Sequence, residues 1–220
     1  MDFFLFAIIG LIFIMAVIFS SNKNPKSKTS INIVNQNKIY AYLDEHNLTN
    51  LNKFVARDYS GALVYSENDE MVTIISPKLK KDNGEYEFNY ITLPSSKIIE
   101  AEIIIDNQTI HKTVRGQQIL NTAVGGALFG SVGALIGGLT ADKLKQEKIK
   151  SIDLKILTED VNSPVHKLNF LKNIDPNSGE VIKDGYMKDS SEVRAALGNI
   201  EKWHGIMEII IRQQNKSANV

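Results

Sequence analysis

The uncharged run of residues 116–141, GQQILNTAVGGALFGSVGALIGGLTA, constrains the fold of this chain more than any other feature. Small residues recur in it at every fourth position, and on an α-helix they would form one nearly straight stripe, with a shorter stripe beside it. Such stripes let two helix backbones approach closely, chiefly in membranes. The first stripe consists of Thr122, Gly126, Gly130, Ala134 and Gly138, and the second of Gly133, Gly137 and Ala141.

The glycine content of this run requires compensation if the run is helical. Six glycines lie between Gly125 and Gly138, and together they cost about 5–6 kcal/mol relative to alanine in a helix interior. Either the segment is a flexible loop, or close packing offsets that cost. Large apolar residues such as Leu128, Phe129 and Ile136 between the glycines favour a helix or a helical hairpin, with Gly133 as a bend.

A second apolar run, residues 3–19, opens the chain and contains no charge. As a helix it would span about 25 Å, the short end of what crosses a bilayer. A cleaved signal peptide is the main alternative, but no basic residue precedes the run and its end is a poor cleavage site. We therefore expect residues 1–20 to form an uncleaved anchor. The anchoring side chains are Phe3, Phe4, Leu5, Phe6, Ile8, Ile9, Leu11, Ile12, Phe13, Ile14, Val17, Ile18 and Phe19.

Basic residues follow this run and none precedes it. The positive-inside rule then predicts a single-pass cell-membrane protein with its N-terminus outside and its C-terminal domain in the cytoplasm. Lys23, Lys26 and Lys28 lie in a polar juxtamembrane linker, residues 21–35, and are expected to contact anionic lipid headgroups. The 25 basic and 25 acidic residues cancel, so no domain-wide field favours nucleic acid as a partner.

The remaining chain reads as an α+β domain. Residues 36–59 have helical spacing, with a stop at Asn47 and a second short turn from Thr49. From Gly61 the period of the apolar residues changes to two. An amphipathic helix, capped by Asp189 or Ser190, precedes a frayed tail at residues 214–220. Its apolar stripe consists of Val193, Ala196, Leu197, Ile200, Trp203, Met207, Ile210 and Ile211. The predicted strands are Ala62–Tyr65, Met71–Ile75, Glu85–Leu93, Lys97–Asp106, Thr109–Val114, Ser151–Leu157 and Val165–Phe170.

Three passages carry a resemblance to a known family: residues 93–99, LPSSKII, the glycine-rich residues 127–138, and the closing helix through Ile210. The chain resembles the pleckstrin-homology-like (PH-like) domains of bacteria, and more narrowly small membrane-associated proteins in which a glycine-zipper segment lies between two strands. The resemblance covers roughly residues 60–213 and implies a bent antiparallel sheet, a C-terminal helix and an inserted glycine zipper, residues 116–141. That family has no assigned activity, so it supplies no catalytic residues.

Two membrane arrangements of the glycine run stay open. A single helix would reach about 39 Å and could cross a bilayer, whereas each leg of a hairpin would reach only about 18 Å. A single crossing would separate the strands before the run from those after it. Lys112 and Arg115 precede the run and four lysines follow it, which favours the cytoplasmic side for both ends. We therefore predict a short hairpin, with a two-span protein as the alternative.

Recognisable catalytic patterns are missing from the sequence. His46, His111, His166 and His204 lie far apart, without paired-ligand spacing, and are interpreted as surface or packing residues. Ser131 lacks the context of a nucleophile elbow, and no phosphate-loop motif is present. Glu100, Glu102 and Asp106 share one face of a predicted strand, where a solvated face explains them better than a carboxylate cluster. Trp203 is expected in the core, and Tyr186 is a candidate contact residue.

These observations predict a non-enzymatic protein without cofactor or metal. In the first hypothesis it is a membrane-anchored scaffold that forms homo-oligomers through the zipper and presents its domain to a protein or lipid partner. In the second it is an effector of the phage-exclusion or defence type whose glycine segment perturbs the bilayer. An enzyme with an unrecognised site is the third possibility.

Overall fold

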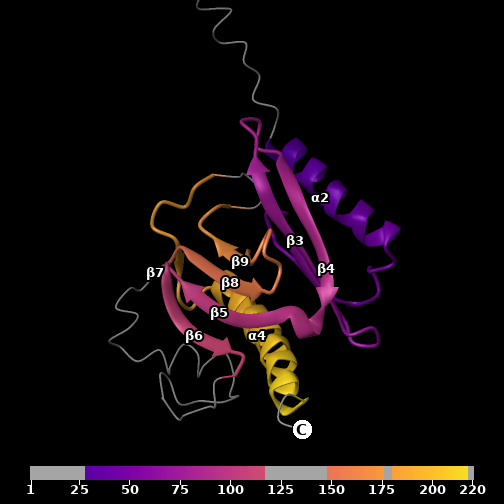
Figure 1. Cartoon of the computed structure of the whole chain (residues 1–220). Coiled ribbons are helices and arrows are strands. Elements are labelled where there is room, and N and C mark those ends of the chain that lie inside the picture. Colours follow the sequence, from indigo (N-terminus) through magenta and orange to yellow (C-terminus); the bar gives the residue numbers. More distant parts are fainter. Residues whose placement is uncertain (1–27, 117–147, 176–179, 218–220) are drawn as a thin grey trace, which may run out of the picture.

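The computed structural model describes residues 28–116, 148–175 and 180–217. These residues form two helices and ten strands, with one short 3-10 turn between the fourth and fifth strands (Figure 1). The elements are α2 (Lys28–Glu45), β1 (Asn52–Val55), β2 (Ala62–Ser66), β3 (Met71–Lys80), β4 (Tyr86–Pro94), η1 (Ser95–Lys97), β5 (Ile98–Ile105), β6 (Gln108–Val114), β7 (Lys148–Ile149), β8 (Ser151–Thr158), β9 (Val165–Lys172), β10 (Tyr186–Met187) and α4 (Ser191–Ser217).

Two four-stranded antiparallel sheets form the body of the fold. The first has the order β1-β2-β3-β4 and the second the order β6-β5-β8-β9, while β7 and β10 form a small separate ladder. The prediction of one bent sheet is therefore corrected to two sheets. Pro94 ends β4, and because it has no N–H it cannot continue the ladder as a donor. The chain then turns through η1 and enters the second sheet as β5.

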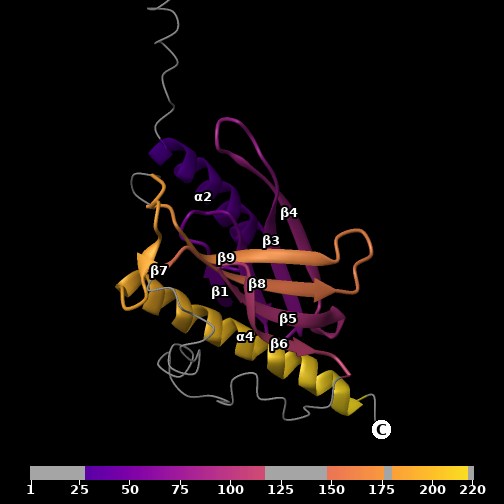
Figure 2. The ribbon, with the colours of Figure 1, turned by 90° about the vertical axis from the view of Figure 1, so that its left-hand side faces the viewer.

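The main core lies between the two sheets and against α4. Leu63 and Ile74 of the first sheet, Ile103 and Leu154 of the second sheet and Trp203 of α4 belong to one buried cluster. Figure 2 shows α4 running across the end of the sheets, beneath β5 and β8. The helix therefore closes the open end of the two-sheet body, as predicted for a domain of strands followed by one long helix.

Helix α4 confirms the sequence prediction closely. Ser190 caps it, because the Ser190 hydroxyl oxygen accepts a hydrogen bond from the backbone N–H of Val193 at 3.3 Å. Trp203, the only tryptophan of the chain, is 1% exposed, in agreement with its predicted core position. All members of the predicted apolar stripe are buried, namely Val193, Ala196, Leu197, Ile200, Trp203, Met207, Ile210 and Ile211.

Helix α2 differs from its prediction at its start, and so does the segment that follows it. The helix begins at Lys28, inside the predicted linker, and the predicted turn after Thr49 is instead strand β1. The predicted stop is confirmed, since Asn47 has a positive φ of 56° just after the helix. The start was not predicted because the first half of α2 lacks a continuous apolar stripe. From Ile31 to the end of the helix, the buried residues are Asn35, Ile39 and Leu43.

Strands on either side of the glycine-rich run belong to one sheet. Strand β5 precedes the run, β8 follows it, and the two pair antiparallel with Ile103 opposite Leu154. Strict alternation along β5 predicts that Ile99 shares one face with Ala101, Ile103 and Ile105, and for Ile99 this prediction is wrong. A register shift between Ile98 and Glu100 reverses the local alternation, so that Ile98 and not Ile99 joins the core residues Ala101, Ile103 and Ile105.

The predicted anchor and its lipid-contacting residues Lys23 and Lys26 lie outside the described residues, as do the zipper positions from Thr122 to Gly138. Lys28 is the first residue of α2. Among the described helices, neither combines the length and the apolar character that a bilayer crossing requires. The anchor, the zipper and the orientation therefore stay predictions.

Candidate functional site

The predicted carboxylate row on β5 is buried. Glu100 and Glu102 are 7% and 5% exposed, which corrects the interpretation of a solvated strand face. Lysine side chains from neighbouring strands cover them: Lys112 of β6 lies 2.8 Å from Glu100, and Lys155 of β8 lies 2.8 Å from Glu102. Because the lysine stems lie along the sheet, the carboxylates are shielded by their own partners.

The same network continues to the far edge of the sheet. Asp153 of β8 is 3% exposed; it lies 2.9 Å from the Lys167 ammonium and accepts a hydrogen bond of 2.7 Å from Asn169 of β9. We refer to Glu100, Glu102, Lys112, Asp153, Lys155, Lys167 and Asn169 as the ion-pair face.

Within the ion-pair face, Glu102 is not suited to act as a general acid. Burial by itself raises the pKa of Glu102, but hydrogen bonds from Lys155 and Thr109 outweigh burial and lower its pKa below the usual value. Glu102 is therefore ionised at neutral pH, whereas a general acid needs a raised pKa. Asp106, the third predicted member, instead accepts hydrogen bonds from the backbone N–H groups of Lys150 and Ser151 at 2.9 and 2.8 Å.

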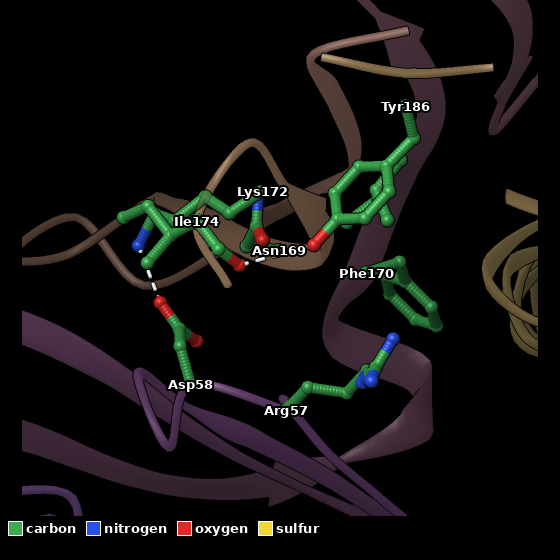
Figure 3. A pocket seen from close by; sticks show the side chains of 8 residues that line it. Arg57, Asp58, Asn169, Phe170, Lys172, Ile174 and Tyr186 are labelled. Carbon is green, nitrogen blue, oxygen red and sulfur yellow. Dashed lines mark hydrogen bonds and ion pairs between the residues drawn. The ribbon is translucent and has the colours of Figure 1, made fainter. Parts of the chain in front are cut away.

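A small cavity lies where the two sheets meet near the end of β9 (Figure 3). Its charged groups are Arg57 and Asp58, from the turn after β1, and Lys172 at the end of β9. Asp58 and Lys172 form an ion pair of 2.7 Å, and the Tyr186 hydroxyl donates to the Ile174 carbonyl at 3.2 Å. Tyr186, the predicted contact residue, thus lines this cavity.

The dimensions and charges of this cavity argue against a substrate or headgroup site. Its volume is about 20 Å³, enough for roughly one water molecule, whereas small-molecule pockets have volumes of about 300–1,000 Å³. Burial lowers the pKa of Lys172, but the Asp58 carboxylate outweighs burial and raises it, so the ammonium stays charged and paired. We conclude that the Asp58–Lys172 ion pair connects the two sheets here, and that the cavity is too small for a metabolite.

The histidines were interpreted as scattered surface or packing residues, and two of them meet in the structure. His111 of β6 and His204 of α4 have ring centroids 4.8 Å apart, at an interplanar angle of 79°. Glu208 lies one helical turn after His204 and belongs to the same cluster. The four-residue spacing of His204 and Glu208 along α4 can be read from the sequence. His111, however, is 93 positions before His204, and the pairing of β6 with β5 brings it close to α4.

The other two histidines fit the interpretation. His46 is exposed and stacks on Tyr42 with ring centroids 4.0 Å apart. His166 is 1% exposed among the packed residues of β9, and burial lowers its pKa below the ordinary value for histidine. A neutral, buried ring is a packing residue.

Two packed antiparallel sheets closed by a C-terminal helix, with strands on both sides of a glycine-rich insertion, define a PH-like domain. The model of the family described as "Glycine zipper containing PH domain" matches residues 50–172. The chain belongs to this family, which is a family of PH-like domains and is not known as an enzyme family.

The chain is also similar to two curated proteins. The chain is 39% identical over 160 residues to a protein of Bacillus phage SPbeta named "Immunity protein", covering 73% of this chain and 74% of that protein. It is also 39% identical over 160 residues to the "SPbeta prophage-derived uncharacterized membrane protein YomJ" of Bacillus subtilis strain 168, covering 73% of this chain and 66% of that protein. No solved structure matches the chain significantly.

Proposed function

We propose that this chain is a non-enzymatic, membrane-anchored protein that self-associates through its glycine zipper and presents its PH-like domain to a partner in the cytoplasm. The pairing of β5 with β8 is the observation that carries this proposal. Because these strands lie on either side of the zipper segment and belong to one sheet, both ends of the segment must lie on the same side of the membrane. This favours the hairpin over a second span.

The domain's partner is a protein rather than a lipid headgroup. Among the described residues, the charged cavity holds about one water molecule and its Lys172 is neutralised by Asp58. The ion-pair face likewise pairs its lysines with carboxylates. Lipid contact is therefore assigned to Lys23, Lys26 and Lys28 beside the anchor.

Crosslinking in native membranes tests self-association. A leucine in place of Gly130 on the long stripe would hold two helix backbones apart, so Gly130→Leu should abolish the crosslinked oligomer. Val132→Leu is the control, because on the predicted helix position 132 lies on the side opposite Gly130, so this change should leave the oligomer intact. Equal oligomer yields from Gly130→Leu and the unchanged chain would rule the zipper out as the contact.

Orientation can be measured with one introduced thiol, because the chain contains no cysteine. Asp82 is exposed in the turn between β3 and β4. The thiol of Asp82→Cys should react with an impermeant maleimide only after cells are opened, whereas that of Asp2→Cys should react in intact cells. The reverse pattern would place the domain outside.

A second candidate function is favoured by the phage relative named "Immunity protein". In this alternative the chain is an effector of phage exclusion or defence whose glycine segment perturbs the bilayer. The full chain, reconstituted into dye-loaded vesicles of phosphatidylethanolamine and phosphatidylglycerol, would release the dye if this function is correct. Retention of the dye, together with a zipper-dependent oligomer, supports the scaffold.

A further inference from the structure

Three ligand-type side chains from two elements converge beside α4. His111 extends from β6, and His204 and Glu208 occupy successive turns of α4. One ligating atom from each of the three lies within 4.8 Å of the other two. His204 and Glu208 are 4% and 7% exposed, whereas His111 is half-buried and gives the cluster access to solvent.

The surroundings of His204 prepare one ring nitrogen as a ligand. The His204 ring is 4% exposed and lies beside the ring of His111. Its Nε2 lies 3.4 Å from the backbone carbonyl oxygen of Ala101, which can only accept a hydrogen bond. The tautomer that donates from Nε2 leaves a lone pair on Nδ1. A ligating histidine is typically oriented in this way by a backbone carbonyl.

Glu208 is oriented by a partner as well. Arg212, one turn further along α4, donates to the Oε1 atom of Glu208. This contact fixes the carboxylate and uses one of its two oxygens. Hydrogen bonds to ligating carboxylates are a recurrent feature of metal sites. The positive charge of Arg212 also opposes a cation, so we expect affinity on the order of 1 μM, well below that of structural zinc sites.

We propose that His111, His204 and Glu208 bind one divalent transition-metal ion of the zinc class, which fastens β6 to α4. Two imidazole nitrogens and one carboxylate oxygen suit zinc, whereas calcium and magnesium prefer oxygen ligands. With bonds of about 2.0–2.1 Å, the ligand atoms would draw together to about 3.4 Å. The fourth position is left for water.

The position of β6 gives this site a structural consequence. Strand β6 is an edge strand of the second sheet, paired only with β5 among the described strands. It ends at Val114, directly before the glycine-rich run at Gly116. A metal ion would therefore hold the strand that leads into that run. This inference is independent of the proposed scaffold function, because it rests on the packing of β6 against α4 alone.

Metal titration of the purified full chain in detergent tests the site. After treatment with a chelator, the chain should bind one equivalent of Zn²⁺, as measured by calorimetry. Zn²⁺ should also raise the thermal unfolding midpoint of the chain. Co²⁺ should produce the visible absorption of a site with nitrogen ligands. His111→Gln and Glu208→Gln should each weaken Zn²⁺ binding by more than the roughly 10–100-fold caused by loss of an outer-shell partner.

Matched controls separate the site from general effects of mutation. His46→Gln changes an exposed histidine outside the cluster, and Glu201→Gln changes a glutamate two turns earlier on α4; both should bind Zn²⁺ as the unchanged chain does. His111 is half-buried, so His111→Gln should fold, as circular dichroism without metal would verify. No binding by the unchanged chain, or equal binding by His111→Gln, would overturn the proposal.

Discussion

The outward faces of the two sheets are covered in different ways. On the first sheet, Ala62 and Val64 of β2 and Ile75 of β3 form a buried cluster with Ile39 and Leu43 of α2. Figure 1 shows α2 lying beside β3 and β4 of this sheet. On the second sheet the outward residues form the ion-pair face, which no helix of the described chain covers. An apolar outer face requires a second layer, whereas a sheet whose charges pair across strands can face water.

This difference makes α2 part of the domain although it lies outside the matched family region, residues 50–172. Removing α2 would expose the apolar outer face of the first sheet. The helix also forms polar contacts there: Asn35 accepts from the Tyr86 N–H at 2.9 Å, and Lys38 donates to the Tyr86 carbonyl at 3.0 Å. The folded unit therefore includes α2 from Lys28, which is also the last of the predicted linker lysines.

The largest expected effect is a cavity beneath α2. Leu43 is fully buried between α2 and the first sheet, so Leu43→Ala should lower the free energy of unfolding by about 2–5 kcal/mol. Urea denaturation of the full chain, followed by Trp203 fluorescence, measures the change. Ile33→Ala, at a half-exposed position of the same helix, should change it by less than about 0.5 kcal/mol. A small effect at Leu43 would mean that α2 is not required.

The next effect concerns the polar contact between α2 and β4. Asn35 is 1% exposed and accepts from the Tyr86 N–H. Asn35→Ala would leave that N–H without its acceptor, at a cost of about 1–3 kcal/mol. Hydrogen exchange should show faster exchange at Tyr86 than in the unchanged chain. An unchanged exchange rate of the Tyr86 amide would show that β4 stays ordered at Tyr86 without the hydrogen bond to Asn35.

On the second sheet, Lys155→Met should lower the free energy of unfolding by about 1–3 kcal/mol at pH 7, because Glu102 stays buried without the Lys155 ammonium. This loss should depend on pH in a defined direction. In the unchanged chain, the pKa of Glu102 is lower in the folded state than its ordinary value of about 4.5. The ionised carboxylate therefore stabilises the fold fully above about pH 4.5, and this stabilisation is lost as the pH falls through the folded-state pKa. Without Lys155, burial raises the pKa of Glu102, so protonation relieves the penalty as pH falls.

The difference in unfolding free energy between the two proteins should therefore shrink between pH 7 and about pH 4. Urea denaturation at several pH values measures it. A difference that stays constant with pH would show that Lys155 contributes by packing of its stem and not by its charge.

The smallest effect is expected at the exposed rim of the same face. The Lys167 side chain is half-exposed, and Asp153 keeps its hydrogen bond from Asn169 when Lys167 is lost. Lys167→Ala should therefore change the free energy of unfolding by at most about 1 kcal/mol, and less at high salt. A larger and salt-insensitive loss would indicate that the ion-pair face acts as a single unit.

The two faces also differ in how far the sequence predicts them. Strand β8 alternates apolar and charged residues, so its pattern indicates which side chains face the core; β2, with the run ALVYS, is apolar on both faces. That run predicts a cover on its outer side, but the covering helix α2 shows little amphipathic pattern of its own. The inversion at Ile98 and Ile99 depends on a register shift, which periodicity does not reveal.

The histidine cluster shows the same limit. The four-residue spacing of His204 and Glu208 on a predicted helix indicated that they share a face. Placing His111 beside them requires the register of β6 on β5 and the docking of α4 on β5, which are long-range contacts absent from any local pattern. The lysines that cover Glu100 and Glu102 come from β6 and β8, and were not predicted for the same reason.

The pairing of β5 with β8 also determines how the protein would respond to a single backbone cut. A cut within residues 117–147 would leave β5 in the first fragment and β8 in the second, although these two strands pair with each other in the second sheet. Helix α4 would add a second apolar contact between the fragments, since it packs against β5, which precedes the cut, as well as against β8 and β9, which follow it. We therefore expect two separately expressed fragments to reassemble into one domain, a property useful for building a split reporter of membrane assembly.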